Sequence, residues 1–149
     1  MLLSVGEGMV DAAVSERYVE VIRASLPAIR RHLDQSSDRF YVNLFTVAPE
    51  LRALFPPDMA DQGMRFMSTL IVMANLIDDP DAFTASLARL AAIHARAGVR
   101  AAHFAPMGHA LLVTLGETMG PEFTSALQEA WRAAYDHIAE EMIRRGGFA

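Results

Sequence analysis

The stretch that decides the fold reads Leu-Ala-Arg-Leu-Ala-Ala-Ile-His-Ala-Arg-Ala-Gly-Val and spans residues 87–99. Its apolar positions continue those of the preceding turn at helical intervals, which predicts one face of an α-helix. The residues on this face are Phe83, Leu87, Leu90 and His94. Gly98 follows as a residue that tolerates positive φ where the helix would end. The stretch therefore predicts a helix with a single imidazole on an otherwise apolar face.

A histidine on an apolar helix face needs partners for both of its ring nitrogens. His94 can be a core or edge residue that a carbonyl group or water satisfies. It can instead bind a metal through one ring nitrogen, including the iron of a haem. The stretch alone favours the first interpretation, because most such histidines are structural.

The composition narrows the class of protein. The chain has 149 residues, 52% of them hydrophobic and 21% charged, which suits one globular domain. Its net charge of −5 leaves no basic surplus for binding nucleic acid. The lack of cysteine excludes disulfides and thiolate metal sites, and it fits a reducing compartment. Residues 1–10 make a poor signal peptide and no apolar run is long enough for a membrane span, so we expect a cytoplasmic protein.

Hydrophobic periodicity predicts an all-α protein of six or seven helices, without a strand pattern. The small, irregular residues at 1–14 indicate a loose tail, which is followed by one domain at 15–149. Ser15 is a candidate N-cap of the first helix, which Pro27 should kink or divide, and residues 34–37 offer a turn before the second helix. The later expected helices span 49–55, about 60–77, one from Asp79 to Gly98, about 100–119, and one that starts at Gly120-Pro121-Glu122 and ends at Gly146-Gly147.

The sequence lacks the motifs of several common enzyme classes. It has no phosphate-binding loop, dinucleotide fingerprint, His-Glu-x-x-His zinc motif or nucleophile elbow. No two of its five histidines are three or four residues apart, so no single helix offers a two-histidine metal site. We interpret His103 and His109 as surface or helix-start residues.

Aromatic residues gather in the first half of the chain. They are Phe40, Tyr41, Phe45, Phe55 and Phe66. Such residues usually form a core, but a helical domain that encloses a flat apolar ring needs the same lining, with few polar groups at its centre. The polar side chains on apolar helix faces are Tyr41, Gln62 and His94.

Several motifs occur in order over about residues 15–142. They are Phe40-Tyr41-x-x-Leu44-Phe45, Pro49-Glu50-Leu51-Arg52-x-Leu54-Phe55, Gln62, His94-x-x-x-Gly98-Val99, His103-Phe104-x-x-x-Gly108-x-x-Leu111-Leu112 and Trp131-x-x-x-Tyr135. Their order and spacing resemble those of single-domain bacterial haemoglobins, which are related to the globin domain of flavohaemoglobins. The resemblance implies a globin fold of six to eight helices around a haem pocket, with haem b as the cofactor.

The resemblance assigns His94 the role of the proximal histidine, which binds the iron. Its other ring nitrogen should donate to a backbone carbonyl one turn earlier, such as that of Leu90. Phe55 resembles the phenylalanine that wedges the haem. The residues that would line the proximal side are Leu90, Val99 and Phe104. The residues expected to contact the haem are Phe40, Tyr41, Phe45, Leu54, Phe55, Gln62, Arg65, Phe66, Leu90, His94, Val99 and Phe104.

On the distal side, Tyr41 resembles the tyrosine that donates a hydrogen bond to bound O₂, and Gln62 resembles the distal polar residue. In an enzyme of this family these two would be the catalytic residues. Phe66 stands where relatives often carry leucine, so we expect its bulk to narrow access. Arg65 or Arg96 would reach the haem propionates.

Two features depart from the flavohaemoglobin pattern. Phe104 takes the place of a proximal tyrosine, and the glutamate that pairs with it would fall in or beyond Gly146-Gly147. We therefore expect less electron donation from the proximal histidine. The 149 residues also hold no flavin or nicotinamide domain, so nitric oxide dioxygenation would need a separate reductase.

The sequence thus leaves three functions open. The first is a haem globin that reversibly binds a diatomic gas (O₂, NO or CO) for storage, delivery or sensing. The second is a nitric oxide dioxygenase with an external electron donor, and the third is a haem-free sensor or interaction domain of globin-like fold. We expect neither nucleic acid nor a membrane as partner, and the oligomeric state stays open, a homodimer included.

Overall fold

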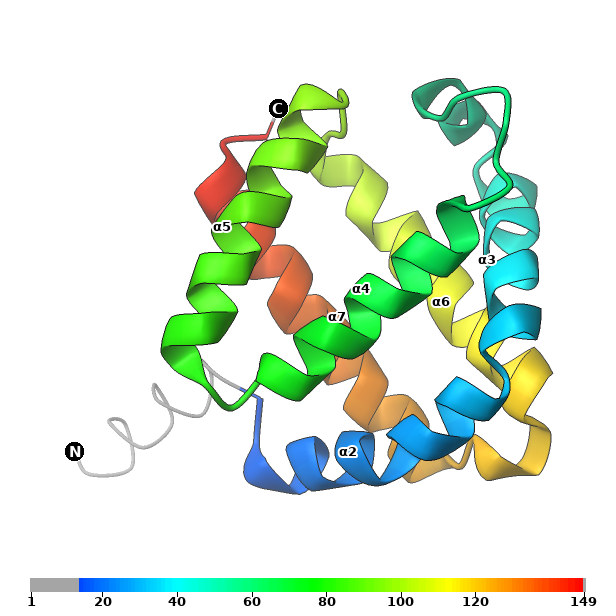
Figure 1. Ribbon diagram of the computed structural model, residues 1–149, viewed down its shortest axis with the longest axis vertical. Coiled ribbons are helices and arrows are strands. Elements are labelled where there is room, and N and C mark those ends of the chain that lie inside the picture. Colours follow the sequence, from blue (N-terminus) through cyan, green and yellow to red (C-terminus); the bar gives the residue numbers. More distant parts are fainter. Residues whose placement is uncertain (1–13, 149) are drawn as a thin grey trace.

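The computed structural model describes residues 14–148, and every regular element in that range is helical (Figure 1). The α-helices are α2 (Glu16–Arg31), α3 (Leu33–Val47), α4 (Gln62–Leu76), α5 (Pro80–Arg96), α6 (Phe104–Met119) and α7 (Ser125–Gly146). The 3-10 helices are η1 (Pro49–Leu54), η2 (Ala101–His103) and η3 (Gly120–Glu122). The all-α prediction is confirmed, whereas the tail predicted at residues 1–14 lies, except for residue 14, outside the described residues. None of these helices is long and apolar enough to cross a membrane.

Two predicted helix starts are confirmed. The Ser15 hydroxyl accepts a hydrogen bond from the Tyr18 backbone N–H at 3.3 Å and so caps α2. The Asp79 carboxylate caps α5 by accepting from the Ala82 N–H, also at 3.3 Å. Each cap satisfies a backbone donor that has no partner within its own helix. At the far end of α5, Gly98 adopts the expected positive φ of 88°.

The turn expected at residues 34–37 is wrong. Helix α3 already begins at Leu33, and the chain changes direction at His32. The two serines of the segment are buried, and the Ser36 hydroxyl lies 2.9 Å from the Thr118 hydroxyl on α6. Packing against α6 therefore overrides the turn preference of the Asp and Ser side chains.

Two other expected helix boundaries are also corrected. Helix α2 continues through Pro27, so of the two expected effects of this proline, a kink or a division, the division does not occur. The segment Gly120–Glu122 forms η3, and α7 begins only at Ser125. The Thr124 hydroxyl accepts from the Leu127 N–H at 3.2 Å, which makes Thr124 the N-cap. A side-chain oxygen satisfies this donor, which a glycine at the predicted start could not do.

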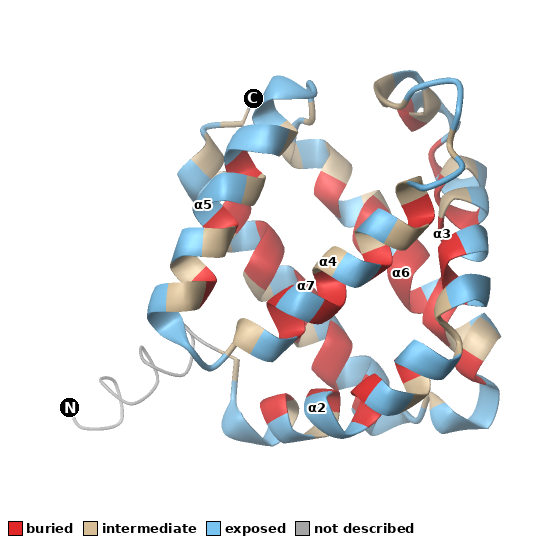
Figure 2. Ribbon diagram, in the orientation of Figure 1, coloured by how far each residue is buried: buried red, intermediate tan, exposed pale blue. Residues whose placement is uncertain are grey.

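The helices enclose one core. Helix α3 packs against α4 and α6, while α7 packs against α2 and α5. In Figure 1, α4 crosses in front of α6 and α7, with α3 on one side and α5 on the other. Figure 2 shows the buried residues on the inward faces of these helices. Trp131 of α7 is completely buried. Burial of these apolar faces holds the helices in place.

The crossing of α3 and α4 depends on a glycine. A Cβ atom at Gly63 would collide with the carbonyl oxygen of Ser37, so the two backbones approach more closely than any side chain allows. The close crossing brings Tyr41 of α3 and Gln62 and Phe66 of α4 to the wall of the same cavity. Gly63 thus positions the polar residues that the sequence singled out.

Candidate functional site

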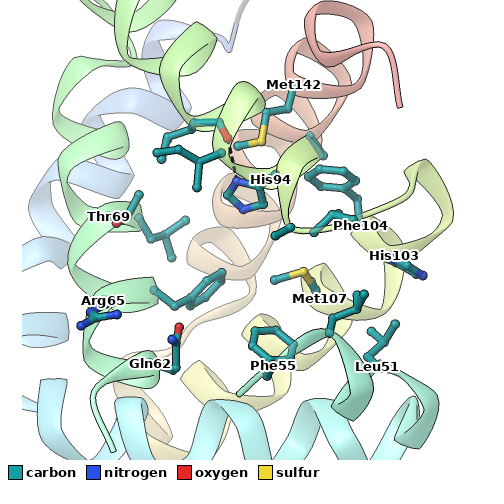
Figure 3. Close-up of a pocket in the computed structure, with 18 of the residues that line it drawn as sticks. Leu51, Phe55, Gln62, Arg65, Thr69, His94, His103, Phe104, Met107 and Met142 are labelled. Carbon is teal, nitrogen blue, oxygen red and sulfur yellow. Dashed lines mark hydrogen bonds between the residues drawn. The ribbon is translucent and has the colours of Figure 1, made fainter. Parts of the chain in front are cut away.

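A cavity of about 590 Å³ lies between α4, α5, α6 and α7, and residues of α3, η1 and the loop after η1 close its remaining sides (Figure 3). Its volume falls within the roughly 300–1,000 Å³ of cavities that hold a cofactor or small ligand. Most of its walls are aliphatic or aromatic. Ten residues predicted from the sequence line it: Tyr41, Leu54, Phe55, Gln62, Arg65, Phe66, Leu90, His94, Val99 and Phe104.

His94 lies in the last turn of α5, and its ring points into the cavity (Figure 3). Its Nδ1–H donates to the carbonyl oxygen of Leu90 at 2.8 Å, as expected from the sequence. This bond fixes the tautomer and leaves Nε2 with its lone pair exposed. No other described residue hydrogen-bonds to the ring. The arrangement presents one free imidazole nitrogen to an apolar cavity.

Tyr41 supplies a hydroxyl to the same cavity. Its ring packs edge-on against Phe55, with the ring centroids 4.9 Å apart, and tilts against Phe45 at 5.7 Å. Burial raises the pKa of Tyr41 to about 12, so the phenol stays protonated at neutral pH. No described residue hydrogen-bonds to this hydroxyl, and it is not sealed from the cavity. Tyr41 therefore offers an unused hydrogen-bond donor.

Phe40 and Phe45 do not line the cavity, contrary to their predicted contact with a haem. Phe40 is completely buried and stacks on Phe66 with 3.9 Å between centroids and 10° between planes. Phe45 packs edge-on against Phe55 at 5.6 Å. Both therefore support the lining residues from behind. Arg96, the alternative to Arg65 for the propionates, is not part of the lining either.

Arg52 holds the loop that carries Phe55. Its Nη1 donates to the carbonyl oxygens of Phe55 and Pro56 at 3.3 and 2.9 Å, and its Nη2 donates to that of Pro57 at 3.0 Å. Its guanidinium also lies 5.6 Å from the ring centroid of Phe45. The motif around this arginine is visible in the sequence, but its role is not, because bonds to backbone carbonyls leave no spacing pattern.

Helix α7 contributes a wall of the cavity that was not predicted from the sequence. The lining residues on this helix are Tyr135, Ile138, Ala139 and Met142. The Tyr135 hydroxyl donates to the carbonyl oxygen of Phe104 at 2.8 Å, which ties α7 to the first turn of α6. Burial raises the pKa of Tyr135, so this donor stays protonated. A signal existed in the helical spacing of these residues, but it did not distinguish a cavity wall from an ordinary core.

The two histidines interpreted as surface or helix-start residues differ in their surroundings. His103 ends η2 and directly precedes α6, which agrees with its interpretation as a helix-start residue. Its Nδ1 accepts a hydrogen bond from the Arg100 N–H at 2.9 Å. It also borders the cavity, which was not predicted. His109 is exposed on α6 and lies outside the lining.

The donor set of the cavity suits a haem better than a bare metal ion. Among the described residues, no three His, Asp or Glu side chains converge to form a metal site. His94 is therefore a single candidate ligand, which matches the need of a haem iron that already has four porphyrin nitrogens. The apolar walls suit the macrocycle, and Arg65, which is exposed at the border of the cavity, suits its carboxylates.

Comparison with protein families agrees with this geometry. A family model described as Globin matches residues 38–142. The flavohemoprotein of Bordetella pertussis is 32% identical over 128 residues, which cover 84% of this chain and 32% of that protein. The flavohemoprotein of Vibrio cholerae is 28% identical over 137 residues, covering 90% of this chain and 35% of its own length. The chain thus spans about a third of these relatives.

Two solved structures have the same fold. An engineered carbene transferase from Rhodothermus marinus, provisionally assigned as a nitric oxide dioxygenase, is 34% identical with a TM-score of 0.82, covering 91% of this chain and 94% of its own. A bacterial globin from Campylobacter jejuni, 20% identical, has a TM-score of 0.78 over 89% of this chain and 96% of its own. The predicted fold class is confirmed by these matches.

Proposed function

Because the chain belongs to the globin family, we propose that it holds haem b through His94 and reversibly binds a diatomic gas, O₂ above all, beside Tyr41. The observation that carries this proposal is the state of His94. Its Nδ1 is satisfied by the Leu90 carbonyl at 2.8 Å, and no residue in the described part of the chain bonds to its Nε2, which faces a cavity of about 590 Å³. A buried structural histidine needs a partner for each ring nitrogen, and no described residue supplies one for Nε2.

Each residue of the cavity would have a separate role toward the haem. The iron of the bound haem would supply the site that takes up O₂, NO or CO. The bond from His94 to Leu90 fixes the imidazole orientation toward that iron. Phe55 and Phe66 line the cavity with apolar surface, which disfavours water there. Arg65, at the border of the cavity, suits the haem propionates. No carboxylate among the described residues bonds to His94, so electron donation from the ring is modest.

Tyr41 gives the site its preference for O₂. Bound O₂ carries negative charge on its outer atom, so a hydroxyl donor forms a charge-assisted hydrogen bond worth about 1.5–3 kcal/mol. That energy corresponds to roughly tenfold or more in the rate of O₂ release. CO carries little charge and gains little from the same donor. Gln62, which also lines the cavity, supplies a second amide donor.

Haem titration of the purified chain tests the proposal. We expect one equivalent of haem to bind with an intense Soret band, because one ligand and one apolar cavity are present. His94→Ala should weaken that band and haem retention. The matched control is His109→Ala, which removes an exposed imidazole outside the cavity and should leave the spectrum unchanged. A wild-type chain without a Soret band would contradict the proposal.

Nitric oxide dioxygenation is the second candidate function. It is supported by the likeness to a structure provisionally assigned to that activity, at 34% identity and a TM-score of 0.82. The flavohemoproteins that resemble the chain are about three times its length, so their activity carries over only as a proposal. Tyr41 and Gln62 would hold O₂ while NO enters, and electrons would come from a separate reductase.

Rapid mixing distinguishes the two functions. The chain loaded with haem and O₂ is mixed with NO, and its return to the reduced state is followed with cell extract as the electron source. Re-reduction fast enough for repeated turnover would support the enzyme. Re-reduction much slower than any useful turnover would leave reversible gas binding as the function.

A further inference from the structure

The chain beyond α7 folds back onto the protein. Gly147 adopts a positive φ of 63°, which reverses the chain at the end of the helix. Phe148 then lies over Gly146, where a Cβ atom would stand only 2.5 Å from the Cε2 of the Phe148 ring. Two glycines in succession therefore direct one aromatic ring toward the body of the protein.

The ring of Phe148 contacts Phe104 edge-on, with 5.4 Å between centroids and 62° between planes. Phe104 in turn stacks beside His94, with 6.3 Å between centroids and 25° between planes. The carbonyl group of Phe104 is held by the Tyr135 hydroxyl, but that bond does not fix its side chain. Phe148, which does not line the cavity, is thus an aromatic neighbour of the Phe104 ring, which does line it.

We propose that Phe148 is a positioning residue for His94, acting through the Phe104 ring; the inference rests on haem ligation by His94. Phe148 does not line the cavity, so it lies outside the space that a haem and its gas ligand would occupy. It also lies outside residues 38–142, the part matched by the family model. Of the Phe148–Phe104–His94 series, only Phe148 lies beyond the part of the chain that the family model matches.

The expected effect follows from the rotational freedom of Phe104. An aromatic edge contact restrains the ring, and its loss lets the Phe104 side chain sample more rotamers. The Phe104 ring then restrains the orientation of the His94 imidazole less, and we expect water to reach the His94 side of the cavity more easily. Since the strength of one aromatic pair sets the scale, we expect haem loss to accelerate by about two- to tenfold.

Three variants test the side chain itself. Phe148→Ala removes the ring, and Phe148→Leu restores part of its volume without the aromatic edge. The matched control is Phe123→Ala, because Phe123 is also half-buried against the core but lies outside the cavity lining. Haem transfer from the holoprotein to excess apomyoglobin measures the rate of haem loss. We expect Phe148→Ala to be fastest, Phe148→Leu intermediate and Phe123→Ala close to wild type.

A second measurement does not need haem. In the apoprotein, the ring current of Phe104 should shift the NMR signals of the His94 ring protons, because the two ring centroids are 6.3 Å apart. These signals can be assigned by their loss in His94→Gln. Phe148→Ala should move these signals toward those of a free imidazole, whereas Phe123→Ala should not. If the wild-type chain retains no haem, the proposed function fails, but this measurement still decides the role of Phe148.

Gly146→Ala provides an independent route to the same effect. Its methyl group would displace the Phe148 ring without removing it. We expect faster haem loss in Gly146→Ala alone and no further increase when it is added to Phe148→Ala. The proposal is overturned if Phe148→Ala changes neither haem loss nor the His94 signals, or if Phe123→Ala changes both equally.

Discussion

The ring of Phe66 stacks on the ring of Phe40 at 3.9 Å, with only 10° between their planes. Phe40 is completely buried on α3, while Phe66 lies on α4 and reaches the cavity. The stack therefore fixes a bulky side chain beside Tyr41, where the two rings lie 6.5 Å apart. We therefore expect this stacked ring to narrow the approach of a small ligand to Tyr41.

Phe66→Leu should open the distal side. The shorter side chain removes ring atoms from the cavity, so CO association measured after flash photolysis should become faster. Loss of the stack on Phe40 should cost about 1 kcal/mol of stability. Phe83→Leu is the control, because Phe83 is buried on α5 outside the cavity lining. An unchanged association rate in Phe66→Leu would mean that Phe66 does not control access.

Tyr41→Phe should increase the O₂ dissociation rate by about tenfold or more, since it removes a charge-assisted hydrogen bond and little volume. CO dissociation should change far less, because CO offers a weak acceptor. Stopped-flow displacement of each gas measures both rates in the same protein. If the O₂ rate stays the same, another donor such as Gln62 stabilises the ligand.

The raised pKa of Tyr41 predicts how the apoprotein responds to alkali. Burial raises this pKa to about 12 from an ordinary value of 10.0. Between these values the folded chain binds more protons than the unfolded chain, so the free energy of unfolding falls as the pH rises. Tyr41→Phe should reduce the slope of that fall. Urea unfolding of both apoproteins between about pH 9 and about pH 12 compares the slopes, and equal slopes would contradict the prediction.

Gly63→Ala should destabilise the protein by at least about 2 kcal/mol, because its methyl group would collide with the backbone of Ser37. Gly116→Ala is the matched control within a helix. Its Cβ would lie 3.7 Å from the Phe123 ring, an ordinary contact, and alanine favours the helix by up to about 1 kcal/mol. In urea unfolding, the free energy of unfolding should therefore fall in Gly63→Ala and rise in Gly116→Ala. Similar losses in both would show that the α3–α4 crossing tolerates a side chain.

Local signals in the sequence predicted much of the fold. The caps at Ser15 and Asp79 and the helix end at Gly98 depend on neighbouring residues only, and the structure has all three. The prediction of a turn at residues 34–37 was wrong because the Ser36 hydroxyl forms a hydrogen bond with the Thr118 hydroxyl, more than eighty residues later in the chain. Contacts over such a distance override local preference, and a single sequence does not reveal them.

The candidate site was predictable to a similar degree. The helical spacing before His94 predicted its face, and its bond to Leu90 follows from family geometry. It was harder to predict which aromatic residues reach the cavity. Phe40 and Phe66 stack on each other, but only Phe66 faces the cavity. The contact between Phe148 and Phe104 escaped prediction, since it depends on a chain reversal after α7.

The central claim is that Nε2 of His94 binds the haem iron, and chemical rescue tests it most directly. His94→Gly removes the imidazole and leaves a hole beside Phe104, which free imidazole can fill. The absorption spectrum of the reduced, haem-loaded variant should differ from wild type and return to it when imidazole is added. A His94→Gly spectrum identical to wild type before imidazole is added would contradict the account.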